Sequence, residues 1–223
     1  AKDFLDGGSI DSYAVAGDYL YLVYARFAVP TEYELWKSDG TPGGTHEVHQ
    51  FAPGEHPFGL VNFEGSLLVS VNTDASVNLV RIESNRAATP LTHFADFSSY
   101  VFQRAVVSGD SAYFCVLNNN ATSLWITDGT PAGTFVISEL PVFGGRQATA
   151  VAALPARDVV IVSGVSTLVV STHGTAGGTE VLAHIATSSY NVARSVAVTF
   201  ENRVYFTIDR SESGLQLLRT KGS

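Results

Sequence analysis

The 223-residue sequence has few charged residues, a single cysteine and no methionine. Charged residues make up 15% and hydrophobic residues 45%, a balance that excludes a disordered or solvating polymer. The longer apolar runs, such as DVVIVSGVSTLVV, contain Gly, Ser and Thr, and none reaches the roughly 20 residues of a membrane-spanning helix. We therefore expect no direct membrane insertion. The net charge of -8 repels phosphate backbones, so nucleic acid is not an expected partner.

The single cysteine, Cys115, cannot form an internal disulfide. Its apolar neighbours in SAYFCVLN predict a small buried residue rather than a reactive thiol. A chain of this length can build its core without disulfides, so cysteine usage leaves the compartment open. Because the chain begins at Ala1 and contains no Met, we expect its first residue to be a processed or trimmed end.

Long stretches with helical periodicity are also absent. In their place stand short runs of Val, Tyr, Phe, Leu and Thr separated by Gly, Asp, Asn and Pro, which is typical of an all-β protein. One phrase recurs as ELWKSDGTPGGTHEV at 34–48, SLWITDGTPAGTFVI at 123–137 and LVVSTHGTAGGTEVL at 168–182. With weaker copies around Leu79 and Leu217, five copies follow one another about every 45 residues and fill the chain.

A second phrase accompanies each copy, a polar turn followed by an aliphatic-aromatic strand, as in AGDYLYLVYA. An apolar strand precedes each turn, so every repeat consists of four predicted antiparallel strands. Four strands at this pitch are the signature of a β-propeller blade. Because the strands are apolar at nearly every residue, both faces of each sheet need cover. Blades stacked around an axis provide that cover.

The predicted fold is therefore all-β, a single five-bladed β-propeller domain spanning residues 1–223. The N-terminal AKDFLDGG is expected to supply the outer strand that the last blade lacks, which closes the ring and pairs two sheet edges. The predicted blades are 12–50, 58–96, 102–141, 149–187, and 194–223 together with 1–8.

The DGT phrase predicts a tight hairpin between the third and fourth strands. Asp39 can accept a hydrogen bond from the backbone amide two residues on, and Gly40 can adopt a positive φ. A calcium or phosphate site is the alternative, but one carboxylate per loop is too few for calcium. The Asp position also changes to Glu83, His173 and Lys221 in other copies. We therefore predict no metal site and no cofactor.

The two tryptophans, Trp36 and Trp125, stand at the same position of the repeat, where other copies have Val80, Val170 and Leu218. An aromatic residue at an otherwise aliphatic position predicts packing between blades, and a binding platform is the alternative.

The phrase ELWKSDGT…GT resembles the ELWxxDGT repeat family of bacterial, mostly secreted or cell-surface proteins. In the second good copy Ser123 replaces the expected Glu, and the third copy keeps its Gly and Thr residues but loses the Trp and the Asp. The resemblance implies a propeller and an extracytoplasmic location, and it carries no catalytic assignment. The matching residues are Glu34, Leu35, Trp36, Asp39, Gly40, Thr41, Gly44 and Thr45, then Leu124, Trp125, Asp128, Gly129, Thr130, Gly133 and Thr134.

Sequence motifs that indicate catalysis are absent: there is no G-x-S-x-G elbow, cysteine pair, H-E-x-x-H or phosphate loop. His46 and His49 share one predicted strand but are three residues apart, so their side chains are expected on opposite faces and cannot chelate a metal together. His93 is predicted to be an outer-strand surface residue. His184, among apolar residues in VLAHIA, is predicted to be partly buried and hydrogen-bonded.

The loops that lead into the inner strands contain aromatic, amide and guanidinium groups. Such groups offer flat faces for stacking and planar hydrogen-bond donors, which suit a glycan or a peptide. For each residue the alternative is a cap on the core or a solvated surface position. The candidate ligand-binding residues are Tyr13, His56, Phe58, Phe102, Gln103, Arg104, Arg146, Gln147, Tyr190, Asn191 and Arg194.

These features predict a non-catalytic binding module of a secreted or surface bacterial protein that recognises a glycan or a protein partner. The alternative is a structural or assembly propeller domain of a larger complex. A glycosidase-type enzyme needs two carboxylates at a defined separation. The predicted inner strands supply mainly Asp11, so we do not predict an enzyme.

Overall fold

A computed structural model describes residues 7–84, 87–94, 99–101, 105–118, 121–140, 147–164, 166–186, 196–210 and 214–220. The chain divides into two compact units, residues 1–104 and 105–223. Among the described residues the only helical element is the 3-10 turn η1 (Ala176–Gly178). No helix in that part of the chain is long and apolar enough to cross a membrane.

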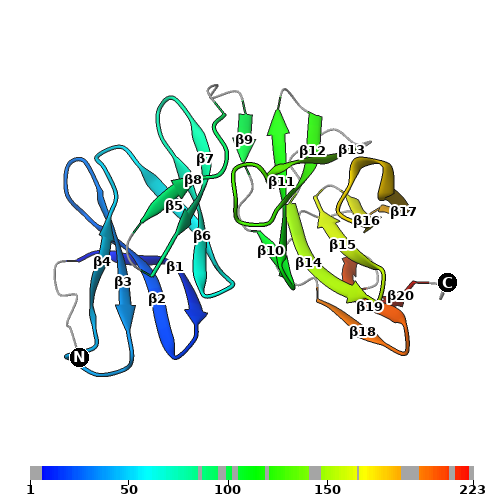
Figure 1. Cartoon of the computed structure of the whole chain (residues 1–223), viewed down its shortest axis with the longest axis horizontal. Coiled ribbons are helices and arrows are strands. Elements are labelled where there is room, and N and C mark those ends of the chain that lie inside the picture. The colour runs from blue at the N-terminus through cyan, green and yellow to red at the C-terminus, as the bar shows by residue number, and fades with distance from the viewer. Residues whose placement is uncertain are drawn as a thin grey trace. The chain divides into compact units, whose positions relative to one another are not determined.

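The first unit contains two four-stranded antiparallel sheets whose strands pair in chain order, followed by a short strand, β9 (Ser99–Val101) (Figure 1). The first sheet is β1 (Ser9–Ala16), β2 (Tyr19–Arg26), β3 (Glu32–Ser38) and β4 (His46–Gln50). The second sheet is β5 (His56–Phe63), β6 (Ser66–Asn72), β7 (Val77–Ile82) and β8 (Ala88–Pro90).

The second unit contains three further sheets whose strands follow the same order (Figure 1). The third sheet is β10 (Val106–Ser108), β11 (Ser111–Asn118), β12 (Ala121–Thr127) and β13 (Phe135–Leu140). The fourth sheet is β14 (Gln147–Leu154), β15 (Arg157–Ser163), β16 (Ser166–Thr172) and β17 (Thr179–Ala186). The fifth sheet is β18 (Ala197–Phe200), β19 (Arg203–Arg210) and β20 (Gly214–Arg219).

The five sheets confirm the all-β class, and each predicted repeat contains one sheet. The boundaries differ by a few residues, since the second sheet starts at His56 rather than at Phe58. The fifth sheet has three strands among the described residues. Of its predicted fourth strand, residues 1–8, residues 1–6 lie outside the described part and residues 7–8 are not in a strand, so ring closure stays a prediction.

The core of the first unit lies between its two sheets. Because successive residues of a strand face opposite sides, Val23 of β2 and Leu35 of β3 face the second sheet and are fully buried. Leu60 and Val69 meet them from β5 and β6. The opposite face of the first sheet carries a smaller cluster of Leu22, Tyr24 and Trp36.

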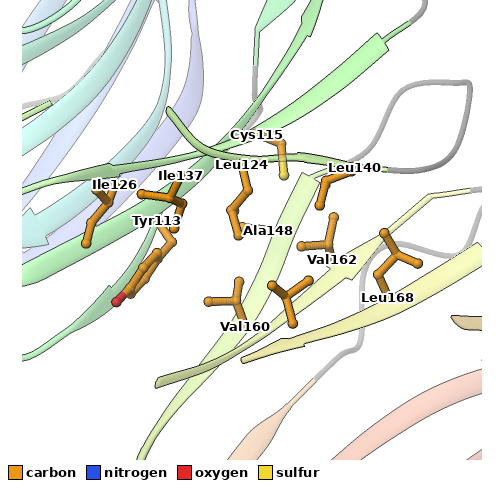
Figure 2. Close-up of a cluster of buried hydrophobic side chains, with 11 residues drawn as sticks. Tyr113, Cys115, Leu124, Ile126, Ile137, Leu140, Ala148, Val160, Val162 and Leu168 are labelled. Carbon is orange, nitrogen blue, oxygen red and sulfur yellow. The ribbon is translucent and has the colours of Figure 1, made fainter. Parts of the chain in front are cut away.

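The second unit has two cores of the same kind. Figure 2 shows the cluster between the third and fourth sheets, where Cys115, Leu124 and Leu168 are fully buried. The burial of Cys115 confirms its prediction as a core residue. A second cluster joins the fourth and fifth sheets through residues such as Ile161 and Phe206. Stacking of consecutive sheets on apolar faces is therefore repeated within each unit.

A carboxylate connects the third and fourth sheets at the margin of the first of these cores. The Tyr113 hydroxyl donates a 2.7 Å hydrogen bond to Asp158 Oδ2, and the Ser108 hydroxyl donates a 2.8 Å bond to Asp158 Oδ1. Burial, followed by the hydrogen bond to Asp158, raises the pKa of Tyr113. The phenol is thus held in its neutral, donating form.

The DGT loops have the predicted geometry. Asp39 Oδ1 accepts from the Thr41 amide over 2.9 Å, and Asp128 accepts from the Thr130 amide over 2.8 Å. Gly40 has a φ of +88°. Hydrogen bonds from Thr41 lower the pKa of Asp39, as expected for a carboxylate that accepts from a backbone amide. The loop is a structural hairpin whose Asp closes the turn.

The third copy shows which parts of the hairpin are essential. His173 replaces the Asp, yet the Gly178 amide still donates to the Thr175 hydroxyl over 3.2 Å. The Thr179 hydroxyl still donates to the Thr175 carbonyl over 2.6 Å. The Thr and Gly residues therefore keep the fold of the loop after the carboxylate is lost.

The histidines behave largely as surface residues. His93 is exposed as predicted, while the prediction of partial burial for His184 is wrong. Alternation along β17 places Ala183 and Ile185 against the core and His184 on the other face, exposed, where its Nε2 lies 2.7 Å from the Ser166 hydroxyl. Among the described residues, no group of three or more His, Cys, Asp or Glu could hold a metal ion.

Candidate functional site

The first strands of the first, second and fourth sheets, β1, β5 and β14, each contain a β-bulge. In β1 the register shifts between Ile10 and Ser12, so Asp11 has no partner on β2. In β5 the register shifts between Phe58 and Val61. A bulge adds a residue to one strand, bends it and re-aims a side chain, and bulges are frequent beside binding sites. Gly59 has a φ of +66°, which explains the glycine at this place in a strand.

The two bulges border an open groove of about 550 Å³. This volume lies within the range of small-molecule sites, roughly 300–1,000 Å³. The groove lies within the first unit, between the neighbouring strands β1 and β5. Its lining residues are Ile10, Asp11, Ser12, Tyr13, Gly59 and Leu60.

Two residues that line the groove, Asp11 and Ser12, carry polar side chains. The exposed carboxylate of Asp11 accepts a 2.8 Å hydrogen bond from Ser9 at Oδ1. The hydroxyl oxygen of Ser12 is buried and has no hydrogen-bond partner among the described residues. A buried hydroxyl without a partner is costly to the fold, and a bound ligand group can offset this cost if the side chain rotates toward the groove.

Tyr33 contacts His56 and is near enough to Asp11 to be affected by its charge. The Tyr33 hydroxyl and His56 Nδ1 are 3.3 Å apart, and the two rings meet edge to face with centroids 5.3 Å apart. Burial, and after it the negative charge of Asp11, raises the pKa of Tyr33. The negative charge of Asp11 therefore acts on the Tyr33 phenol, which does not line the groove, as well as inside the groove.

The structure brings together part of the predicted ligand-binding set. Tyr13 lines the groove, whereas His56 does not line it and contacts Tyr33. Phe58 is half-buried at the bulge of β5 without lining the groove, and Gln147 opens β14 in the second unit. The remaining predicted residues lie outside the part whose side chains are described, namely Phe102, Gln103, Arg104, Arg146, Tyr190, Asn191 and Arg194.

The repeat gives Tyr13 a second role. Tyr13 stands four residues before the turn that follows its strand, as do Leu60 and Val151. Leu60 is 2% exposed and packs against the preceding sheet, and Val151 does the same from β14. The side chain of Tyr13 is 69% exposed at this packing position. Tyr13 can therefore pack against another sheet as well as contact a ligand in the groove.

Sequence reasoning noted Asp11 only as an isolated carboxylate and missed Ser12 and Tyr33. The available signal was Gly59, since a glycine inside an apolar strand indicates a bulge or a close approach of another group. The bulge of β1 has no such marker in the sequence, because its extra residue, Asp11, is not a glycine.

Comparison with known proteins supports the fold class. No family model matches the chain, and no curated protein matches it. A nidogen/laminin complex matches with a TM-score of 0.56 at 10% identity, over 96% of this chain and 76% of that chain. TolB from Acinetobacter baumannii matches with a TM-score of 0.51 at 15% identity, over 97% of this chain and 55% of that chain.

A prolyl endopeptidase structure matches with a TM-score of 0.55 at 11% identity, over 92% of this chain and 31% of that chain. The chain thus spans about three quarters of the nidogen/laminin chain, about half of TolB and about a third of the endopeptidase. These similarities show a β-propeller-like fold. At such low identity the likeness extends to the fold alone.

Proposed function

We propose that the chain is a non-catalytic binding module that recognises a glycan or a protein partner through the groove between β1 and β5 and the neighbouring loops. The observation that carries this proposal is the pair of adjacent bulges, which opens a groove with Asp11 and the unpartnered hydroxyl of Ser12 in its wall. Bulges interrupt sheet pairing and are frequent beside binding sites, and β14 of the fourth sheet contains one as well.

The composition of the groove supports binding rather than hydrolysis. Its lining residues include one carboxylate, Asp11, whereas glycoside hydrolysis uses two at a defined separation. Peptidase structures are among the similar folds, as is a nidogen/laminin complex, which is an assembly of proteins by its name. The propeller-like fold itself is compatible with either role.

We further propose that the five sheets are the blades of one closed propeller. Leu124 and Val169 stand at the same repeat position as Leu35 and are buried, with 0% and 2% of their surface exposed. The equivalent residue of the fifth sheet, Leu217 of β20, is 68% exposed. The first sheet likewise keeps an apolar face that carries Tyr13. Packing of these two faces against each other would bury both, as the other sheets do within each unit.

The DGT hairpins and the Trp positions support membership of the ELWxxDGT repeat family, and with it a secreted or cell-surface location in a bacterium. The hydrogen-bonded Asp, Thr and Gly residues of the hairpin are those that the motif specifies. The family is defined by this hairpin, so it supports the fold and the location rather than a ligand.

A binding screen tests the proposed function. The purified protein is offered to a glycan array and a peptide library, and each hit is repeated with Asp11→Ala and Ser12→Ala. We expect both substitutions to weaken binding at least tenfold. Asp18→Ala is the control, because Asp18 is an exposed carboxylate in the turn at the opposite end of β1. Absence of any ligand that depends on Asp11 would refute the proposal.

One observation favours the alternative, a structural or assembly domain. The loop between β2 and β3 contains Phe27, which is 66% exposed, and Val29, which is fully exposed at 103%. Exposed aromatic and aliphatic side chains of this kind anchor many protein interfaces. If a partner protein is lost with Phe27→Ser and kept with Asp11→Ala, the assembly role is supported instead.

A further inference from the structure

We infer that the groove selects a sugar ring without negative charge, neutral or amino, and rejects acidic sugars. This inference rests on the proposed function and names the ligand class of the same site. It follows from three observations: the negative charge in the groove, the pairing of the described Arg and Lys residues with groups outside the groove, and the bulges in the two strand edges.

The charge of the groove comes from Asp11. A carboxylate accepts hydrogen bonds at both oxygens, and Oδ1 already accepts one from Ser9. Two adjacent hydroxyls, or a hydroxyl and an ammonium group, can donate to such an acceptor. The Ser12 hydroxyl is buried, so it can donate to or accept from a third polar group of the ligand only by rotating toward the groove. This set of groups fits a ring substituted with hydroxyls.

The described cations of the first unit are engaged elsewhere. Arg26 forms an ion pair with Glu34 at 2.7 Å, and Arg81 forms one with Glu83 at 2.7 Å. Lys37 lies over the ring of Tyr19, 3.5 Å from its centroid. No Lys or Arg is among the groove-lining residues. Among the residues that the structure describes, an acidic ligand would therefore find no cation beside Asp11, and like charges in contact oppose binding.

The strand edges favour a compact ligand over an extended peptide. β1 and β5 are edge strands of their sheets, and an extended peptide commonly binds by adding a strand to such an edge. A bulge interrupts the regular spacing of backbone groups that an added strand requires, and both edges are bulged at the groove. Gly59 has no side chain there, so a ring can approach the backbone closely.

Matched sugars test the inference. Methyl glucoside is compared with methyl glucuronide, and methyl galactoside with methyl galacturonide, so that each pair differs only by the carboxylate at carbon six. Glucosamine tests the cationic case. Binding is detected by saturation-transfer NMR and quantified by calorimetry, with thermal melts confirming that each variant is folded. The variants are Asp11→Asn and the control Asp18→Asn.

We expect at least one neutral or amino sugar to bind, and to bind at least tenfold more tightly than its acidic counterpart. Asp11→Asn should weaken the neutral sugar several-fold and bring the two members of a pair within about threefold, while Asp18→Asn should leave the ratio unchanged. Equal binding of both members by the unaltered protein would overturn the inference. So would a ratio that Asp11→Asn leaves intact.

Failure of the inference is distinguishable from failure of the proposed function. If peptides bind in a manner that depends on Asp11 while no sugar does, the binding module stands and the ligand class is overturned. If neither sugars nor peptides bind through Asp11, both are overturned.

Discussion

The indole Nε1 of Trp36 donates a 2.7 Å hydrogen bond to the carboxylate of Glu34, two residues earlier on β3. In the third sheet Trp125 makes the equivalent bond, over 2.9 Å, to the hydroxyl of Ser123. The first and third residues of the ELW phrase therefore act as an acceptor and donor pair. Ser123, which departs from the motif in the sequence, preserves the contact because its hydroxyl is also an acceptor.

Replacement of Glu34 by Ala should be costly. Glu34 is 3% exposed and also pairs with Arg26, so its loss removes an acceptor from both the indole and the guanidinium. Breaking a fully buried pair costs about 3–5 kcal/mol, and we expect about 2–3 kcal/mol because solvent reaches part of Arg26. Urea denaturation measures the free energy of unfolding.

The matched control is Ser123→Ala, which removes only neutral hydrogen bonds, one from the Trp125 indole and a long one to the Val116 carbonyl, and should cost about 1 kcal/mol. Equal costs for Glu34→Ala and Ser123→Ala would show that the Arg26 pair adds nothing to stability.

The second prediction concerns the glycines of the DGT hairpin. A Cβ at Gly44 would collide with the carboxyl group of Asp39, whereas a Cβ at Gly43 would meet nothing within 4 Å. Gly44→Ala should therefore destabilise the protein by about 1–3 kcal/mol, as overpacking does. Gly43→Ala should be close to neutral. Thermal denaturation compares the two, and similar melting temperatures would contradict this account.

The sequence predicted the sheets and the hairpins because both depend on local rules. Strand periodicity is read directly from apolar alternation, and the hairpin depends on Asp39, Thr41 and their own backbone. The groove was missed because a bulge changes pairing with the neighbouring strand, which alternation along one strand does not record. The prediction of partial burial for His184 was wrong for the same reason, because the sequence of β17 alone does not say which of its faces meets the core.

The proposed ring makes a third prediction. Truncation of an exposed leucine normally changes the free energy of unfolding by less than about 0.5 kcal/mol. If the free face of the fifth sheet is buried in a closed propeller, Leu217→Ala should instead cost about 2–4 kcal/mol, like other core truncations. Leu182→Ala, on the partly exposed strand β17, is the control with the same chemistry. Two equally small costs would refute closure through this face.

The last prediction is a dependence of stability on alkaline pH that comes from Tyr113. The pKa of Tyr113 is raised in the folded protein above the value of about 10 expected for an unfolded chain, because the phenol is buried and donates to Asp158. Above pH 10 the unfolded chain releases this proton while the folded protein keeps it. The contribution of Tyr113 is therefore complete below pH 10 and is progressively lost as the pH rises further.

Urea denaturation between pH 8 and pH 11.5 measures this loss as a fall in the free energy of unfolding. Tyr113→Phe cannot ionise, so its free energy of unfolding should fall less steeply with pH above 10. Below pH 10 the variant should be less stable by about 1.5–3 kcal/mol, because it lacks the hydrogen bond to a carboxylate. Tyr205→Phe removes a phenol from β19 and should keep the steep fall. Parallel curves for the unaltered protein and Tyr113→Phe would show that the tyrosine and Asp158 are not coupled as the structure indicates.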